Sequence, residues 1–279
     1  MKAAGVALVT GASRGIGRAV ALELAGRGFE VVATMRDPDA GVSLRKQADS
    51  QKLALRVERL DVDDATDFAM PSGLRVLVNN AGIEEAYLPV EHSTVDSWSR
   101  IFRTNLFGLV EVTRLAIPQL RQSGGGVICN VTSSSLLHPM PFYAAYRASK
   151  AAVSALGESL RSELAPFGIR LVEILPGPIE TDMLAGSDRP PEALRFPLYR
   201  ALAQRAQQAR SGIAGDTTPA DAAARTITNV ILDDDAPLRN ACDPLGAAML
   251  ESWRGLSDED WLRAIAGAPP APGPEGEAR

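Results

Sequence analysis

The chain has 279 residues, 46% of them hydrophobic and 23% charged, and its net charge is −5. This length suits one large domain or two small ones with a buried core, and the acidic balance argues against nucleic acid as the main partner, because phosphate binding favours a basic surface. The two cysteines, Cys129 and Cys242, are too few for a disulfide framework. We interpret them as small apolar residues in a reducing compartment.

The N-terminal run from Ala3 to Val9 loosely resembles the apolar part of a signal peptide. It is short for that role and contains a glycine, so a first β-strand is the favoured interpretation. No stretch approaches the roughly 18 to 20 apolar residues of a membrane-spanning helix. We therefore expect a cytoplasmic protein without a membrane partner.

Short apolar runs alternate with longer stretches of helical patterning along most of the chain. Near-continuous apolar strands between helices indicate a parallel sheet covered on both faces, and right-handed crossovers make that sheet doubly wound. The predicted fold class is therefore α/β, a single-domain Rossmann fold over residues 1–265. The predicted strands are 6–10, 30–35, 54–60, 75–79, 126–132 and 169–175, and the predicted helices are 15–28, 94–121 and 144–165.

Three segments depart from this alternation. The connection from Val62 to Leu74 is too short for a full helix with its loops, so this crossover must be abbreviated or irregular. Residues 184–218 are rich in Pro, Arg and Gln and follow a predicted strand end, where a lid over a substrate cleft would lie. Residues 266–279 contain too few apolar groups to offset the entropy of ordering and are predicted to be disordered.

The stretch TGASRGIG, residues 10–17, follows the first predicted strand and begins the first predicted helix. Its glycines have the spacing G-x3-G-x-G. Small residues let the backbone approach a pyrophosphate, which a helix N-terminus binds through free N–H groups and its positive dipole end. A tight turn with close helix packing would also select glycines, so the position after a strand carries the interpretation. The candidate cofactor contacts here are Gly11, Ser13, Arg14, Gly15, Ile16 and Gly17.

The end of the second predicted strand, ATMRD, bears on the choice of cofactor. A carboxylate there would bind the 2′-hydroxyl of NAD, whereas an arginine accommodates the 2′-phosphate of NADP. Arg36 follows the neutral Met35, and Arg14 could approach the same phosphate. NAD remains an alternative because Asp37 follows, and Arg36 could be a solvated surface charge. The pattern nevertheless favours NADP(H) as the cofactor.

The stretch YAAYRASK contains two tyrosines, each with a cation four residues later. Residues four apart share a helix face, so Arg147 could act on Tyr143 and Lys150 on Tyr146. An ammonium ~4.5 Å from a phenol, at an effective dielectric near ~20, favours the phenolate by roughly 3 to 4 kcal/mol, or about 2.5 pKa units. Desolvation opposes that effect. Either pair could therefore place a tyrosine in a useful range for acid–base catalysis.

Six motifs stand in the order and spacing of the short-chain dehydrogenases/reductases, which the sequence resembles over residues 4–235. They are TGASRGIG, NNAG at 79–82, TNLFG at 104–108, NVTS at 130–133, Tyr146-x-x-x-Lys150 and PGPIET at 176–181. The segments ATMRD and PFYAAYRASKAA further resemble the branch of 17β-hydroxysteroid and retinol dehydrogenases.

The resemblance selects Tyr146 as the general acid/base, with Lys150 also holding the ribose hydroxyls of the cofactor. It implies that Ser133, 13 residues earlier, hydrogen-bonds the substrate oxygen, with Ser135 as the alternative, and that Asn105 completes a proton relay through a water. Tyr143 would line the substrate cleft or merely pack.

Further cofactor contacts follow from the same resemblance. Asp61 would accept a hydrogen bond from the adenine amine, with Val62 beside it, and Thr181 would hold the nicotinamide carboxamide. No metal site is expected, because the two histidines, His92 and His138, stand apart and without other ligands. The remaining candidates are Asn80, Ala81 and Gly82 near the adenosine ribose, and Pro176, Gly177 and Ile179 before Thr181.

These features predict an NADP-dependent oxidoreductase that transfers a hydride between the nicotinamide and a ketone or secondary alcohol. The alternatives are a non-redox reaction on the same fold, such as dehydration or epimerisation, and a non-catalytic NADP-binding regulator. The expected partner is a small carbonyl or alcohol substrate. The resemblance also implies a homodimer or homotetramer that pairs through the helices around 94–121 and 144–165.

Overall fold

The computed structural model describes residues 1–187, 190–213, 217–257 and 259–261, and within them seven parallel strands form the central sheet. The strand order is β3-β2-β1-β4-β5-β6-β9, so the chain builds outward from β1 and then returns beside it to continue in the other direction. This reversal is the topology of a doubly wound Rossmann sheet, and it confirms the predicted α/β class. The strands are β1 Val6–Val9, β2 Glu30–Met35, β3 Leu55–Arg59, β4 Leu74–Asn79, β5 Gly126–Val131, β6 Ile169–Ile174 and β9 Arg239–Asn240.

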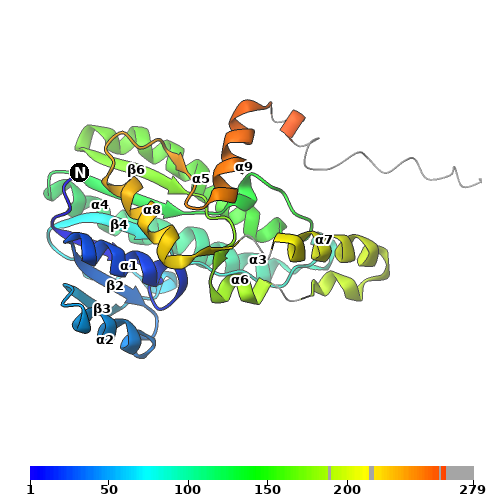
Figure 1. Ribbon diagram of the computed structural model, residues 1–279, viewed down its shortest axis with the longest axis horizontal. Helices are drawn as coiled ribbons and strands as arrows, with labels where there is room; N and C mark the ends of the chain where they lie inside the picture. The colour runs from blue at the N-terminus through cyan, green and yellow to red at the C-terminus, as the bar shows by residue number, and fades with distance from the viewer. Residues whose placement is uncertain (188–189, 214–216, 258, 262–279) are drawn as a thin grey trace, which may run out of the picture.

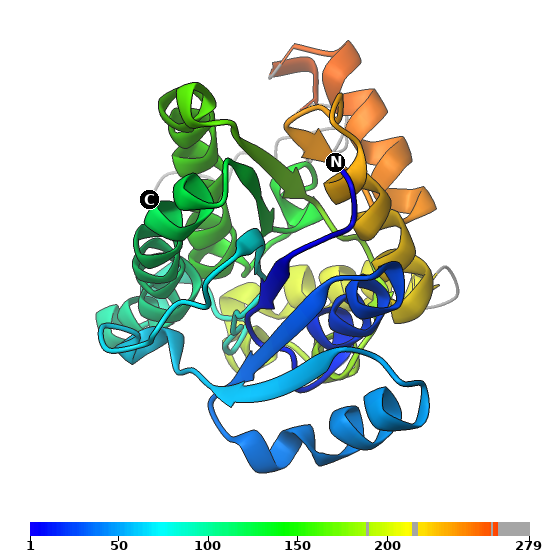
Figure 2. The same cartoon turned by 90° about the vertical axis from the view of Figure 1, so that its left-hand side faces the viewer.

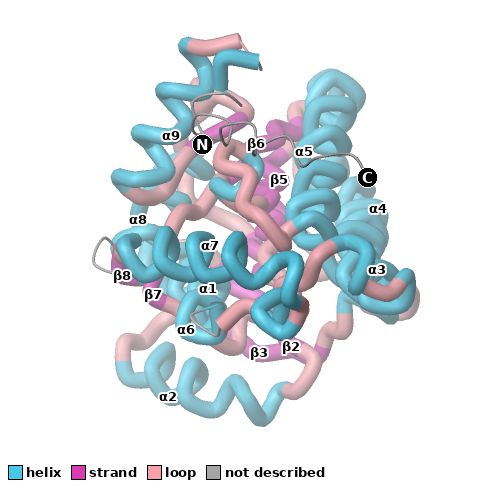
Figure 3. Tube along the Cα trace, turned by 90° about the vertical axis from the view of Figure 1, so that its right-hand side faces the viewer, coloured by secondary structure: helices cyan, strands magenta, loops and turns pink. Residues whose placement is uncertain are grey.

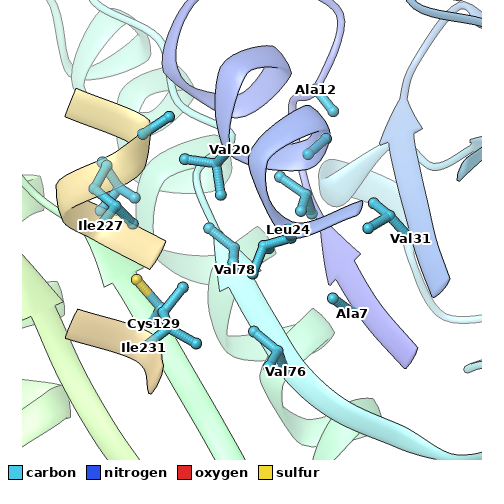
Figure 4. Packing of buried hydrophobic residues seen from close by; sticks show 14 of the residues in the cluster. Ala7, Ala12, Val20, Leu24, Val31, Val76, Val78, Cys129, Ile227 and Ile231 are labelled. Carbon is cyan, nitrogen blue, oxygen red and sulfur yellow. The ribbon is translucent and has the colours of Figure 1, made fainter. Parts of the chain in front are cut away.

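Helices cover both faces of the sheet, α1, α2 and α8 on one face and α4 and α5 on the other (Figures 1 and 2). Side chains of a strand alternate between the two faces: Ala7 belongs to the core beneath α1 and α8, and Leu8 to the core beneath α4. Figure 4 shows the first core, where Val20 of α1 and Ile227 of α8 meet the sheet. The helices are α1 Gly15–Arg27, α2 Val42–Ser50, α4 Leu109–Gln122, α5 Ala144–Leu164 and α8 Ala220–Leu232.

The short connection between β3 and β4 contains a single 3₁₀ turn, Val62–Asp64, and no helix among its described residues. Phe68 and Met70 pack partly buried against the core on the α4 face, so an irregular segment fills part of the place of a crossover helix. On the neighbouring strands the same face is polar. There the guanidinium of Arg56 pairs with the carboxylates of Glu30 and Glu58, which suits a sheet surface without a helix over it.

The predicted helix at 94–121 is three segments: α3 Val95–Phe102, a π-helical turn Arg103–Gly108, and α4. The shortened crossover touches this chain at Gly108. A Cβ added there would lie 2.7 Å from the carbonyl oxygen of Val62, so only glycine lets the two segments approach. π-Helical turns inside α-helices are frequent at functional sites, and this one carries Asn105.

Several elements were not predicted from the sequence. They include the edge strand β9, and the parallel pair of β7 Ile179–Glu180 with β8 Thr218–Pro219. Within 184–218 lie part of α6 Asp182–Ser187 and all of α7 Arg200–Ile213, and α7 crosses the end of the molecule in front of α1 and the strands (Figure 3). α9 Pro244–Gly255 follows β9. The segment predicted to be disordered, 266–279, lies outside the described residues.

Among the described residues, none of the helices is both long and apolar enough to cross a membrane.

Candidate active site

A cavity of about 710 Å³ opens at the carboxyl ends of the strands, where doubly wound sheets bind their ligands. It runs from the loop between β1 and α1 to helix α7, and eighteen of the twenty predicted site residues line it. They are Gly11, Ser13, Arg14, Gly15, Ile16, Arg36, Asp61, Val62, Asn80, Ala81, Gly82, Ser133, Tyr146, Lys150, Pro176, Gly177, Ile179 and Thr181.

The two predicted site residues outside the wall are Gly17 and Asn105. A Cβ at Gly17 would lie 2.3 Å from Nδ2 of Asn80 and 2.5 Å from the carbonyl oxygen of Gly11, so this glycine serves the packing of α1 against the loops. Asn105 is buried, and its Oδ1 accepts from the backbone N–H of Ile83 at 2.8 Å. Its Nδ2 donates to Ser149 Oγ at 3.0 Å. Its role in a proton relay stays a prediction.

The N-terminus of α1 faces the cavity with free backbone donors. In the described chain no side chain caps this end, and its first turn carries no acidic residue. Gly11 and Gly15 have φ angles of 65° and 56°, which favour glycine, and they bend the chain into the helix. The Thr10 hydroxyl accepts from the N–H groups of Asn80 and Ala81, both at 3.0 Å. This loop therefore fits the pyrophosphate of a dinucleotide, whose oxygens the free N–H groups would bind.

The end of β2 presents a cation and no free carboxylate to the cavity. Arg36 is exposed and lines the wall, whereas the carboxylate of Asp37 accepts the N–H of Asp39 at 3.0 Å and caps a 3₁₀ turn. Arg14 lies in the wall as well and pairs with Asp182 at 3.4 Å, both largely exposed. Two guanidinium groups thus line the part of the cavity next to the glycine loop.

Tyr146 and Lys150 lie one turn apart near the start of α5. The Lys150 side chain is buried, its Nζ donates to the carbonyl oxygen of Val131 at 2.9 Å, and it lies 5.9 Å from the centre of the Tyr146 ring. Burial lowers the pKa of Lys150 to about 8, although the negative charge of the nearby Glu173 carboxylate acts in the opposite direction and raises it.

The pKa of the Tyr146 phenol is raised, chiefly by burial, while hydrogen bonding with Ser133 acts in the opposite direction. The expectation that Lys150 makes Tyr146 more acidic is therefore not met. The phenol keeps its proton at neutral pH, which suits a proton donor to a substrate oxygen.

The second tyrosine–cation pair does not form. The Arg147 guanidinium donates to the carbonyl oxygens of Ser135 and Leu136, at 2.8 and 3.0 Å, and so holds the turn that follows Ser133. Tyr143 instead stacks on Tyr87, with ring centres 4.3 Å apart. Tyr143 also lines the cavity, and its place in a substrate cleft stays a prediction.

Three serines of the turn after β5, Ser133, Ser134 and Ser135, line the cavity near Tyr146. The Ser133 oxygen accepts the N–H of Ser135 at 3.1 Å, which leaves its own proton available to a ligand. The Ser135 hydroxyl is buried and has no hydrogen-bond partner in the described chain. Ser133 acts on the phenol of Tyr146 and remains the stronger candidate, and Ser135 stays the alternative.

Two acidic residues that support the site were missed from the sequence. Asp243 accepts the N–H of Gly177 at 2.7 Å and caps α9, so it holds the loop after β6. Glu173 is buried and accepts from the hydroxyls of Thr132, at 2.8 Å, and Ser154, at 2.9 Å. The sequence did carry a signal for Glu173, because it is the single acidic residue in the apolar run IRLVEIL. A carboxylate in a buried strand requires hydrogen-bonding or charged partners.

The half of the cavity beyond Tyr146 is mostly apolar. Among the described residues there, the side chains that carry or gain charge are Glu84, Arg210 and His138. Burial lowers the pKa of His138, which keeps it neutral at neutral pH. Among the described residues no three His, Cys, Asp or Glu side chains are grouped to hold a metal ion. The apolar residues are Met140, Met183, Leu184, Leu245 and Met249.

Comparison with known proteins places these features in context. The family profile for short chain dehydrogenases matches residues 5–191. The chain is 37% identical, over 65% of its length, to an uncharacterized oxidoreductase, YusZ, of Bacillus subtilis, of which it covers 68%. It is 34% identical over 69% of its length to a sulfoacetaldehyde reductase of Chromohalobacter salexigens, covering 79% of that protein. It is 33% identical over 65% of its length to estradiol 17-beta-dehydrogenase 2 of Rattus norvegicus, covering half of it.

Solved structures share the fold along nearly the whole chain. A short chain dehydrogenase of Burkholderia cenocepacia, solved with NADP, superposes with a TM-score of 0.73 at 24% identity, covering 96% of this chain and 100% of the other. A relative from Burkholderia phymatum, solved with NAD, superposes with a TM-score of 0.74 at 26% identity, covering 91% and 93%. Both cofactors thus occur among proteins of this fold.

Proposed function

The chain belongs to the short-chain dehydrogenase family, and on that premise we propose that it is an NADP-dependent oxidoreductase acting on a ketone or secondary alcohol. The observation that carries this proposal is the meeting of Ser133, Tyr146 and Lys150 at one wall of the cavity that the glycine loop also lines. A protein that only sensed the cofactor would have no use for a phenol, a hydroxyl and a buried amine around the place of a substrate oxygen.

Each residue has a separate task in this mechanism. When bound, the cofactor supplies or accepts the hydride. The Tyr146 phenol donates its proton to the carbonyl oxygen during reduction and takes it back during oxidation. The Ser133 hydroxyl hydrogen-bonds that oxygen as negative charge develops, and the Lys150 ammonium holds the ribose hydroxyls. Asn105, fixed through Ile83 and Ser149, is proposed to position the water that passes protons to and from Lys150.

The preference for NADP over NAD is part of the proposal. Arg36 lines the cavity where a 2′-phosphate would lie, and the only carboxylate next to it in sequence, Asp37, is already engaged in a cap. A guanidinium at this position favours a phosphate, whereas NAD would be favoured by a free carboxylate. Arg14 adds a second positive charge from the glycine loop.

The predicted lid and the predicted oligomer also enter as proposals. Met183, Leu184 and Arg210 come from the segment 184–218 or its edge and line the cavity, which supports a lid over the substrate. Phe107 is 62% exposed in the π-helical turn that precedes α4, which supports pairing of two copies through α4 and α5. We propose a cytoplasmic homodimer or homotetramer; two buried free cysteines, Cys129 and Cys242, suit a reducing compartment.

The experiment that tests the function follows NADPH and NADH oxidation at 340 nm against a panel of carbonyl compounds. The panel spans steroid, retinoid, quinone and aliphatic carbonyls and includes small charged aldehydes, because similar proteins bear names as different as sulfoacetaldehyde reductase and estradiol dehydrogenase. We expect oxidation of NADPH in preference to NADH with at least one substrate class. Tight binding of NADPH without turnover across the panel would favour a non-catalytic regulator instead.

A further inference from the structure

We propose that Arg210 forms an anion-binding subsite, so that the substrate of this enzyme is a carbonyl compound or alcohol that also carries a carboxylate or sulfonate. The proposal rests on the proposed function and adds the chemical class of the substrate. Arg210 lies on α7, about sixty residues along the chain from Tyr146, and lines the same cavity.

Arg210 is held in the wall by aromatic faces. Its guanidinium carbon lies 4.6 Å from the centre of the Tyr87 ring and 5.2 Å from that of Tyr143. Tyr143 in turn meets the ring of Tyr146 edge-on, at 6.3 Å between centres. The stack therefore connects the guanidinium of α7 to the catalytic phenol through a single intervening ring. A group bound at Arg210 would lie within the reach of a small bifunctional substrate.

Among the described residues, Arg210 has a side-chain hydrogen bond with Tyr87, and the contacts leave its other donors uncommitted. In the described part of the chain it takes part in no ion pair and donates no hydrogen bond to a carbonyl or carboxylate oxygen. A guanidinium has five N–H donors along its edge, and stacking on a ring occupies only its face. A half-buried cation with free edge donors beside a cavity is matched by a planar oxyanion, which it binds with two parallel hydrogen bonds.

The other charges around the cavity do not replace this role. Arg14 and Arg36 lie at the glycine loop and the end of β2, where the adenosine half of the cofactor would be. His138 is kept neutral by burial. The carboxylate of Glu84 lies next to the stack, where it accepts a hydrogen bond from the hydroxyl of Tyr87 at 2.9 Å. The Tyr87 hydroxyl therefore donates its proton to Glu84 and not toward Arg210. The negative charge of Glu84 also repels an anion, so an oxyanion would bind at the guanidinium.

A second, smaller cavity adjoins this point. It lies between α7 and the loop before α5, and Arg210 and Tyr143 line both cavities. The guanidinium thus stands at the junction, where an anionic group could be bound while the rest of a longer substrate continues past it. Either a short or a long substrate places its charge at Arg210.

Matched substrate pairs test the proposal. Reduction by NADPH would be compared for succinic semialdehyde against butanal, and for 4-carboxybenzaldehyde against 4-methylbenzaldehyde. We expect kcat/KM to be roughly 10- to 100-fold higher for the anionic member of at least one pair, as for a charged hydrogen bond. Arg210→Gln is expected to remove most of that ratio and Arg210→Lys to keep part of it. The control is Arg205→Gln, an exposed arginine on the same helix outside both cavities, which should leave the ratio unchanged.

Binding provides a measurement that does not need turnover. The affinities of benzoate and benzyl alcohol for the protein saturated with NADPH would be compared by the change in cofactor fluorescence. We expect Arg210→Gln to reduce the affinity ratio of benzoate to benzyl alcohol about tenfold or more. Equal binding of both probes, or a ratio that Arg210→Gln leaves unchanged, would overturn the subsite. Turnover of neutral carbonyls without any preference for charge would also overturn it while the proposed function stands.

Discussion

The carboxylate of Glu173 accepts a hydrogen bond from the hydroxyl of Thr132 at 2.8 Å, and this contact ties β6 to the residue that precedes Ser133. The other oxygen of Glu173 accepts from Ser154, one turn beyond Lys150 on α5, at 2.9 Å. Arg239 of β9 lies 3.4 Å from the same oxygen and also pairs with Glu158. A single buried carboxylate thus joins the strand end that carries Ser133 to the helix that carries Lys150.

This geometry predicts that Glu173→Gln alters the pH profile as well as stability. Loss of the negative charge removes the interaction that raises the pKa of Lys150, so the alkaline limb of kcat/KM should move to lower pH. The free energy of unfolding should fall by about 2 kcal/mol, because a charged hydrogen-bonded centre is lost. The matched control is Glu158→Gln, which removes the other partner of Arg239. An identical pH limb in both variants and the parent would show that Glu173 is structural only.

The depressed pKa of Lys150 predicts a rise of stability with pH. The folded protein releases this proton near pH 8 and the unfolded chain near ~10.4, so between those values the unfolded state binds more protons and folding is favoured as pH increases. Between pH 8 and 9.5 the gain is about 2 kcal/mol at most. The measurement is the free energy of urea unfolding of the parent minus that of Lys150→Met at each pH. This difference isolates the contribution of Lys150 and should increase as the pH rises. A constant difference across this pH range would contradict a depressed pKa.

Cofactor choice is predicted to depend on Arg36. Arg36→Ala should raise the Kd of NADPH roughly tenfold, a modest factor because the guanidinium is exposed and screened, and should leave the Kd of NADH nearly unchanged. Arg59→Ala, at the exposed end of β3 and outside the cavity wall, provides the control for a general loss of positive charge. An equal loss of affinity for both cofactors would mean that Arg36 does not meet the 2′-phosphate.

A pair of glycine substitutions tests the shortened crossover. Gly108→Ala places a Cβ 2.7 Å from the backbone oxygen of Val62, and should cost about 1 to 3 kcal/mol of unfolding free energy, because neither backbone can move away freely. Gly26→Ala in α1 meets nothing within 4 Å and should stabilise the helix by about 0.5 to 1 kcal/mol. Thermal unfolding of both variants gives the comparison. Equal stability of the two would place the 62–74 segment away from the π-helical turn.

The sequence located β1, β2, β4, β5 and β6 because most of their residues are buried on both faces. β2 was predicted at its observed bounds, and β1, β4, β5 and β6 within one residue at each end. β9 was missed, since Arg239–Asn240 has two polar residues and no apolar pattern, and its place depends on contacts of Glu173 and Leu238. The π-helical turn was equally invisible, and so was the contact of its Gly108 with Val62, because the two residues are 46 positions apart in the sequence.

The site also has features that local motifs predicted and features that depend on the whole fold. The motifs brought Ser133, Tyr146 and Lys150 to one wall as the resemblance implied. The pKa of Tyr146 was expected to fall because spacing predicts the nearby cation, whereas burial depends on the whole fold and outweighs it. Arg210 carries no local signal either, since only the fold lays α7 across the cavity and puts its guanidinium against Tyr87 and Tyr143.

The most direct test of the central claim compares Tyr146→Phe with Tyr143→Phe in single-turnover hydride transfer from bound NADPH. Both changes remove one phenolic hydroxyl from a residue that lines the same cavity, so the pair separates proton transfer from packing. The account predicts that Tyr146→Phe slows transfer by about 10²-fold or more and changes the Kd of NADPH by only a few-fold, while Tyr143→Phe keeps most of the rate. Hydride transfer in Tyr146→Phe at the parent rate would contradict it.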